Sequence, residues 1–164
     1  MRNRTLILGI GNILLGDEGV GVHVIDAIRD REIPFGTTLL DGGTGSFNLL
    51  EPMQTADRVI LIDATIDDDE PGCIKKIFPR YSTDYPKTLT AHDIGLKDLI
   101  DAFYLSGRSL PEVVLFAITI PVFHELTTEL SNPIAGVVPT IVEMVIEEAS
   151  RPLPVARAAV GLSM

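Results

Sequence analysis

A short apolar segment near the start of the chain breaks into glycines and then gives way to a helical pattern. Residues 5–10 form a continuous, mainly apolar run, which is typical of a parallel strand buried on both faces. Beyond the glycines, Val20, Val24 and Ile28 recur at helical spacing. A buried strand followed at once by an amphipathic helix indicates a fold in which helices cover a parallel sheet.

The same alternation of strand and helix continues along the rest of the chain. We expect further strands at residues 38–40, 58–62, 73–78 and 113–118, and further helices after Ser46, from Asp93 to Gly107, and over residues 138–149. The strand at residues 73–78 is the exception to the alternation, since no clear helix precedes it. The pattern predicts a three-layer α/β/α fold with a central, mostly parallel, twisted sheet of about five strands.

Length and composition indicate one ordinary domain. The chain has 164 residues, of which 46% are hydrophobic, which is enough for one core and too little for two domains of ordinary size. We predict a single domain at residues 1–150 and a loose tail at residues 151–164, where two prolines interrupt any periodicity.

The net charge of the chain and the length of its apolar runs limit its possible partners and its cellular location. The formal net charge of -10 disfavours a nucleic-acid partner, because binding to phosphates needs clustered Lys and Arg. No stretch approaches the roughly 20 apolar residues that a membrane helix needs, so no membrane partner is expected. The single cysteine, Cys73, excludes an internal disulfide and suits a reducing compartment. We therefore expect a cytoplasmic protein.

Acidic side chains gather where the first strands end. Ligands of open parallel sheets bind beyond the carboxyl ends of the strands, and Asp41 and Asp63 follow the second and third predicted strands there. Glu18 lies close behind the first strand, and His92 precedes a predicted helix. Taken singly, Glu18 would more often be an acid at a helix start, and His92 a local hydrogen-bonding residue. Together, Glu18, Asp63 and His92 form a set of ligands suited to a divalent metal, with positions left open for substrate or water.

The glycine loop at residues 9–21 does not match the known phosphate-binding loops. A P-loop has Lys after its last glycine, where this chain has Asp17 after Gly16, and the dinucleotide fingerprint requires a third glycine where Leu14 stands. A nucleotide- or small-ligand-binding module nevertheless remains the alternative function, because Asp41 occupies the position of a ribose-binding acid. His23 and His124 are weaker candidates, and no Gly-x-Ser-x-Gly elbow of a serine hydrolase is present.

Four motifs, in order, resemble those of the [NiFe] hydrogenase maturation endopeptidases, which trim the C-terminus of the nickel-containing large subunit. They are GIGNILLGDEGVG at residues 9–21, DGGT at residues 41–44, IDA at residues 62–64 and HDIGL at residues 92–96. The resemblance extends to about Ala149. It implies a metal-dependent hydrolase in which Glu18, Asp63 and His92 are the metal ligands. Asp41 would be an additional acid near the site, so that these four residues form the predicted catalytic set.

The resemblance also implies the substrate and the origin of the metal. The partner would be the precursor of a hydrogenase large subunit, and the metal would be the nickel that this precursor already holds. Zinc or cadmium is expected to substitute for nickel in crystals. Many members carry a polar residue where this chain has Ile120, which leaves the identity of the hydrogenase open. A second alternative is a hydrolase that keeps its own metal, which three ligands without a second histidine make less favourable.

Overall fold

The protein is described by a computed structural model, in which residues 3–45, 47–80, 82–85, 94–107, 111–122 and 126–154 are placed. The strands are β1 (Thr5–Ile10), β2 (Thr37–Gly43), β3 (Arg58–Thr65), β4 (Ile74–Ile77) and β5 (Glu112–Thr119). The α-helices are α1 (Val20–Ile28), α2 (Leu50–Thr55), α3 (Ile94–Leu105), α4 (Asn132–Ala135) and α5 (Val138–Ser150). Three single 3-10 turns accompany them, namely η1 (Gly16–Gly19), η2 (Phe47–Leu49) and η3 (Ser82–Asp84).

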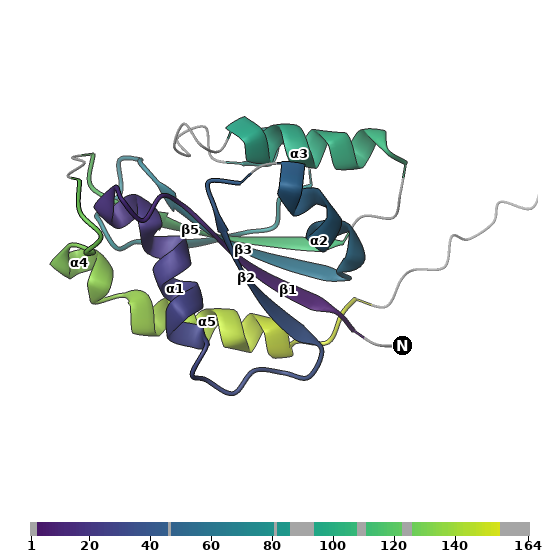
Figure 1. Ribbon diagram of the computed structural model, residues 1–164, viewed down its shortest axis with the longest axis horizontal. Helices are drawn as coiled ribbons and strands as arrows, with labels where there is room; N and C mark the ends of the chain where they lie inside the picture. Colours follow the sequence, from purple (N-terminus) through teal and green to yellow (C-terminus); the bar gives the residue numbers. More distant parts are fainter. Residues whose placement is uncertain are drawn as a thin grey trace, which may run out of the picture.

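The five strands form one sheet in the order β2-β1-β3-β5-β4. All neighbouring pairs are parallel except β4 and β5. Helices α1 and α5 cover one face of the sheet, and α2 and α3 cover the other (Figure 1). The predicted three-layer α/β/α fold with a mostly parallel sheet of five strands is therefore confirmed.

The fourth strand is the one that the alternation of strands and helices did not explain. Only residues 66–73 separate β3 from β4, and this connection is shorter than the dozen or more residues that a parallel crossover requires. Strand β4 consequently lies at the edge of the sheet and runs antiparallel to β5, with Ile74 opposite Ile118 and Ile77 opposite Leu115.

Successive residues of the central strands contribute to two separate cores. Along β3, Ile60 and Ile62 pack in the core beneath α1 and α5, whereas Val59 and Leu61 pack in the core beneath α2 and α3. This alternation follows from the period of two residues in a strand. Asp63 continues the series of Val59 and Leu61, and therefore faces the layer that contains α2 and α3.

Gly21 sets the distance between helix α1 and the sheet. A Cβ atom at this position would lie 2.3 Å from the carbonyl oxygen of Ile62 and 2.5 Å from that of Ile10. Because both neighbours are backbone atoms in the centre of the sheet, they cannot move aside without disturbing strand pairing. Gly21→Ala is expected to lower the free energy of unfolding by about 2 to 3 kcal/mol, measured by urea denaturation.

Gly107→Ala is the control for this substitution. No atom lies within 4 Å of a Cβ atom at Gly107, so the only cost is the positive φ of 64°. The expected loss is about 1 kcal/mol. Equal losses for the two variants would show that Gly21 is not needed for close packing of α1.

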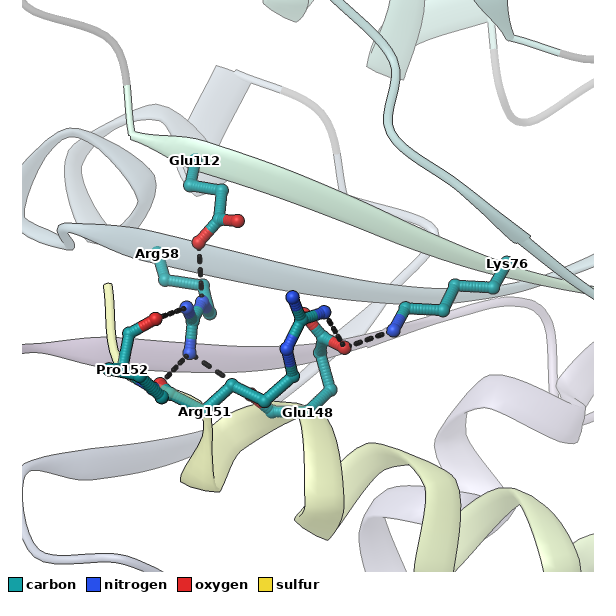
Figure 2. A network of polar contacts seen from close by, with 6 residues as sticks. All are labelled: Arg58, Lys76, Glu112, Glu148, Arg151 and Pro152. Carbon is teal, nitrogen blue, oxygen red and sulfur yellow. Dashed lines mark hydrogen bonds and ion pairs between the residues drawn. The ribbon is translucent and has the colours of Figure 1, made fainter. Parts of the chain in front are cut away.

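A buried arginine fastens the end of α5 to the sheet (Figure 2). Arg58, the first residue of β3, is 1% exposed. Its guanidinium donates hydrogen bonds to Oε2 of Glu112 (2.7 Å) and to the carbonyl oxygens of Glu148 (3.0 Å), Arg151 (2.7 Å) and Pro152 (3.1 Å). These carbonyls belong to the last turn of α5 and the two residues just after it, and that of Glu148 also accepts the N–H of Arg151 (3.2 Å).

The side chain of Glu148 carries a second set of contacts in the same network. Burial raises the pKa of this carboxyl, but hydrogen bonds and ion pairs from Lys76 and Arg151 outweigh burial and lower the pKa overall. Its charge is therefore held by neighbours from β4 and from the residue after α5 (Figure 2).

The predicted tail begins inside this network. Arg151 and Pro152 are held through their carbonyl oxygens, whereas residues 155–164 lie outside the described residues. The domain boundary after residue 150 therefore stays a prediction. Within the ranges that the structure places, no helix combines the length and apolar character needed to cross a membrane.

Candidate functional site

The candidate site is built where the loop after β1 folds back over the end of the sheet. Gly11 donates its N–H to the carbonyl oxygen of Gly43 (2.9 Å), which aligns the loop with the end of β2. A Cβ atom on Gly11 would lie 1.9 Å from the carbonyl oxygen of Glu18, and Gly11 has a φ of 145°. Only glycine permits this approach. It places turn η1, which carries Glu18, against β3.

Two buried carboxylates belong to this edge of the sheet. Glu18 is 7% exposed in η1, and Asp63 is fully buried in β3. Oδ1 of Asp63 accepts a hydrogen bond from the N–H of Ala64 (2.8 Å). Because η1 packs on β3, the carboxylates of Glu18 and Asp63 come from adjoining elements. A pair of desolvated carboxylates is costly unless a cation or hydrogen-bond donors offset the burial, and such pairs are typical of metal-binding sites.

Asp63 lies deeper in the sheet than its sequence context suggests. The third strand was predicted to end at Asp63, but β3 continues to Thr65, which is also buried. The strand continues because Asp63, Ala64 and Thr65 pair with residues of β5, beginning with Asp63 opposite Ala117. Asp63 is therefore a strand residue on a rigid element and not an acid of the following turn.

Asp41 occupies a different position from the two buried acids. It lies in β2, beside Gly9 of β1, and its side chain is exposed. Its Oδ1 accepts a hydrogen bond from the N–H of Gly43 (2.9 Å). Strand β1 separates β2 from β3, so Asp41 approaches the edge of the sheet from the side opposite to β5.

His92, the third predicted ligand, lies outside the described residues, as does His124. Helix α3 begins at Ile94, two residues after His92, and covers the face of the sheet to which Asp63 belongs. Among the residues that the structure places, no three His, Cys, Asp or Glu side chains form a group able to hold a metal ion. The ligand set of Glu18, Asp63 and His92 therefore stays a prediction.

His23, one of the weaker candidates, lies within α1 and is half-buried. Its helix packs on the core beneath α1 and α5.

The structure joins the loop of Glu18 to a distant segment that carries no sequence motif. The N–H of Gly16 donates to the carbonyl oxygen of Thr127 (2.8 Å), and the N–H of Thr127 donates to that of Leu14 (3.1 Å). Next to this bridge, the carboxylate of Asp17 accepts hydrogen bonds from the N–H (2.8 Å) and the hydroxyl (2.7 Å) of Ser131. Asp17 thus joins two loops, whereas the sequence indicated only that it stands where a P-loop would have Lys.

A pocket of about 280 Å³ lies between these two loops. It is lined by Leu15, Gly16, Asp17, Pro121, Thr127, Glu129, Leu130 and Ser131. A larger pocket, of about 390 Å³, lies at the opposite edge of the sheet, where Glu112 begins β5 and Phe103 faces it from α3. Of these two pockets, the smaller one adjoins the turn that holds Glu18.

Fold and site together define the class of protein: an α/β/α domain with buried acids at the carboxyl edge of its sheet. The glycine loop there, at residues 9–21, holds two acids and no Lys or Arg. The chain belongs to the hydrogenase maturation protease family, whose model matches residues 22–148. The matched range includes Asp41, Asp63 and His92, and begins four residues after Glu18.

Individual relatives agree with this assignment. The chain is 34% identical over 145 residues to the hydrogenase 2 maturation protease of Escherichia coli, covering 87% of this chain and 84% of that protein. It is 39% identical over 118 residues to the hydrogenase expression/formation protein HupD of Bradyrhizobium diazoefficiens. That match covers 69% of this chain but only 60% of the HupD protein.

Solved structures give the same result. The hydrogenase maturating endopeptidase HybD from E. coli superimposes with a TM-score of 0.80 at 30% identity, covering 88% of this chain and 91% of HybD. A [NiFe] hydrogenase maturation protease HybD from Thermococcus kodakarensis superimposes with a TM-score of 0.75 at 25% identity, covering 89% and 99%. Family membership, recognised from four sequence motifs, is therefore confirmed.

Proposed function

We propose that this protein is an endopeptidase that removes the C-terminal extension from the nickel-loaded precursor of a [NiFe] hydrogenase large subunit. The observation that carries the proposal is the burial of Glu18 and Asp63 on adjoining elements at the carboxyl edge of the sheet. The family supplies the class of reaction, and two partly desolvated carboxylates supply a reason for the site to attract a divalent cation.

In this proposal the nickel belongs to the substrate, and Glu18, Asp63 and His92 bind it when the precursor docks. Nickel held in this way would polarise the scissile carbonyl or lower the pKa of an attacking water. Asp41 would orient that water or accept its proton, a role that suits an exposed carboxylate at the same edge of the sheet. Recognition of the metal would then distinguish a loaded precursor from an empty one.

We place the protein in the cytoplasm with the precursor as its protein partner. An acidic chain with a net charge of -10 is not expected to bind nucleic acid.

The nucleotide-binding alternative receives no support from the geometry of the loop. Gly11 packs directly on the carbonyl of Glu18, and Asp17 and Glu18 occupy the turn that precedes α1. Phosphate oxygens would meet two acids where a nucleotide-binding loop offers backbone N–H groups. No second function is therefore proposed.

The test compares two forms of the same precursor. Purified protein is incubated with nickel-loaded and with nickel-free large subunit, and the products are followed by gel and mass spectrometry. We expect cleavage of the loaded form only, with release of a short C-terminal peptide. Loading the empty precursor with nickel should restore its cleavage.

Two outcomes contradict the proposal in different ways. Equal cleavage of both forms would show that nickel is not recognised and would favour a peptidase with a metal of its own. Failure to cleave either form, with a protein that unfolds cooperatively, would remove the proposed activity.

A further inference from the structure

Exposed apolar side chains gather beside the candidate site. Among the residues that the structure describes, seven large apolar side chains are strongly exposed, and four of them belong to the two loops that are bridged next to Glu18. We call these four the apolar rim: Ile13, Leu14, Val122 and Leu126. Single exposed apolar residues are ordinary on protein surfaces, whereas a group of them next to a pocket is typical of an interaction site.

Main-chain hydrogen bonds bring two members of the apolar rim, Leu14 and Leu126, close together. Leu14 accepts the N–H of Thr127, and Gly16 donates to the carbonyl of the same residue. Leu126 is the immediate neighbour of Thr127, so Leu14 and Leu126 flank one bridge. Val122 follows Pro121, which lines the same pocket as Thr127. Two segments more than a hundred positions apart in the sequence thus lie side by side.

The apolar rim is also coupled to the turn that carries Glu18. Both carboxylate oxygens of Asp17 bind Ser131, at 2.8 Å to its N–H and 2.7 Å to its hydroxyl. Glu18 is the next residue in the chain. A rim held in this way is formed before a partner arrives, and the loops need little further ordering on binding.

We infer that the apolar rim is the surface on which the large-subunit precursor docks, an inference that rests on the proposed function. Leu14 precedes the turn that carries Glu18 by two residues, so a protein substrate whose scissile bond reaches Glu18 lies beside the rim. The rim adjoins a pocket whose lining includes the polar residues Asp17 and Glu129. Apolar side chains beside polar ones are the usual organisation of a protein interface. The surface determines substrate affinity, and the acids beneath it perform the chemistry.

The experiment compares two leucines of the same exposure. Leu126 in the rim is 87% exposed and Leu105 at the end of α3 is 88% exposed. Leu105 ends α3 two residues after Phe103, which lines the pocket where β5 begins, at the opposite edge of the sheet. Leu126→Gln, and the double variant with Leu14→Gln, are assayed with nickel-loaded precursor beside Leu105→Gln. All three proteins should be as stable as the parent, because the side chains replaced are exposed.

We expect the rim variants to raise KM for the precursor by roughly tenfold or more, and to leave kcat within about twofold. Their affinity for the precursor, measured by titration calorimetry, should fall by the same factor. Leu105→Gln should match the parent in both measurements. A double rim variant with the KM and affinity of the parent would overturn the inference while leaving the proposed function intact.

Two further outcomes keep the inference separate from the proposed function. A parent protein that binds the precursor but does not cleave it would contradict the proposed function, and weaker binding by the rim variants would still support the docking surface. A parent protein that forms a dimer in sedimentation, and a monomer after Leu126→Gln, would show that a second copy of the chain covers the rim. That result would overturn the inference.

Discussion

Glu18→Gln is expected to abolish processing of the nickel-loaded precursor, with kcat/KM reduced by at least about 100-fold. The substitution keeps the shape of the side chain but removes the negative charge, and a neutral amide is a far weaker ligand for a divalent metal. Folding should survive. Glu18 is buried in η1, where loss of a desolvated charge lowers the electrostatic cost of the native state.

The measurements are a cleavage assay and a urea denaturation curve on the same preparation. Glu147→Gln provides the matched control, since Glu147 is exposed on α5 and the substitution is chemically identical. The control should process the precursor at the rate of the parent. A Glu18→Gln variant that retains activity would refute the assignment of Glu18 as a ligand. If the variant is inactive because it is unfolded, the ligand set is tested by substitution of Asp63 and His92 instead.

Arg58→Met is expected to lower the free energy of unfolding by about 3 to 5 kcal/mol. The substitution leaves the partly buried Glu112 carboxylate without its cation, and it removes the donor that binds the carbonyls of Glu148, Arg151 and Pro152. Methionine has a similar length and fills much of the same space, so the loss is electrostatic and not a packing defect. Urea denaturation followed by circular dichroism measures the change.

An exposed arginine provides the comparison. Arg31 pairs with Glu143 on the surface, where both side chains are largely in water, and Arg31→Met should cost less than about 1 kcal/mol. Combining Arg58→Met with Glu112→Gln should recover part of the loss, because no unpaired carboxylate then remains at that position. An Arg58→Met variant as stable as the Arg31→Met variant would show that the buried network contributes no net stability.

Much of the fold follows from patterns within single segments. The apolar runs that became β1, β3 and β5 were visible because strands covered on both faces carry few polar residues. The helical stripe of α5 was visible for the equivalent reason, since one face of that helix packs on the sheet. The edge of the sheet at which Asp41, Glu18 and Asp63 would lie followed from the rule that parallel strands present their carboxyl ends together.

The details that sequence patterns missed depend on pairing between distant segments. The direction of β4 and the continuation of β3 to Thr65 are set by hydrogen bonds to β5. The sequence of neither strand indicates which strand it pairs with. The link between Asp17 and Ser131 joins residues 114 positions apart, and residues 126–131 show no motif that would have identified them. The exposure of Leu14 and Leu126 on one surface is likewise a property of the bridge and not of either loop.

Hydrophobic period and short motifs, read along the chain, were enough to predict the three layers, the family and the candidate acids. The fold itself shows that Glu18 and Asp63 are buried on adjoining elements, that Arg58 holds the end of α5, and that two remote loops are bridged. No local pattern contains these features, because burial and hydrogen bonding between distant residues depend on how the whole chain packs. Local patterns specify which elements form, and packing specifies which side chains meet.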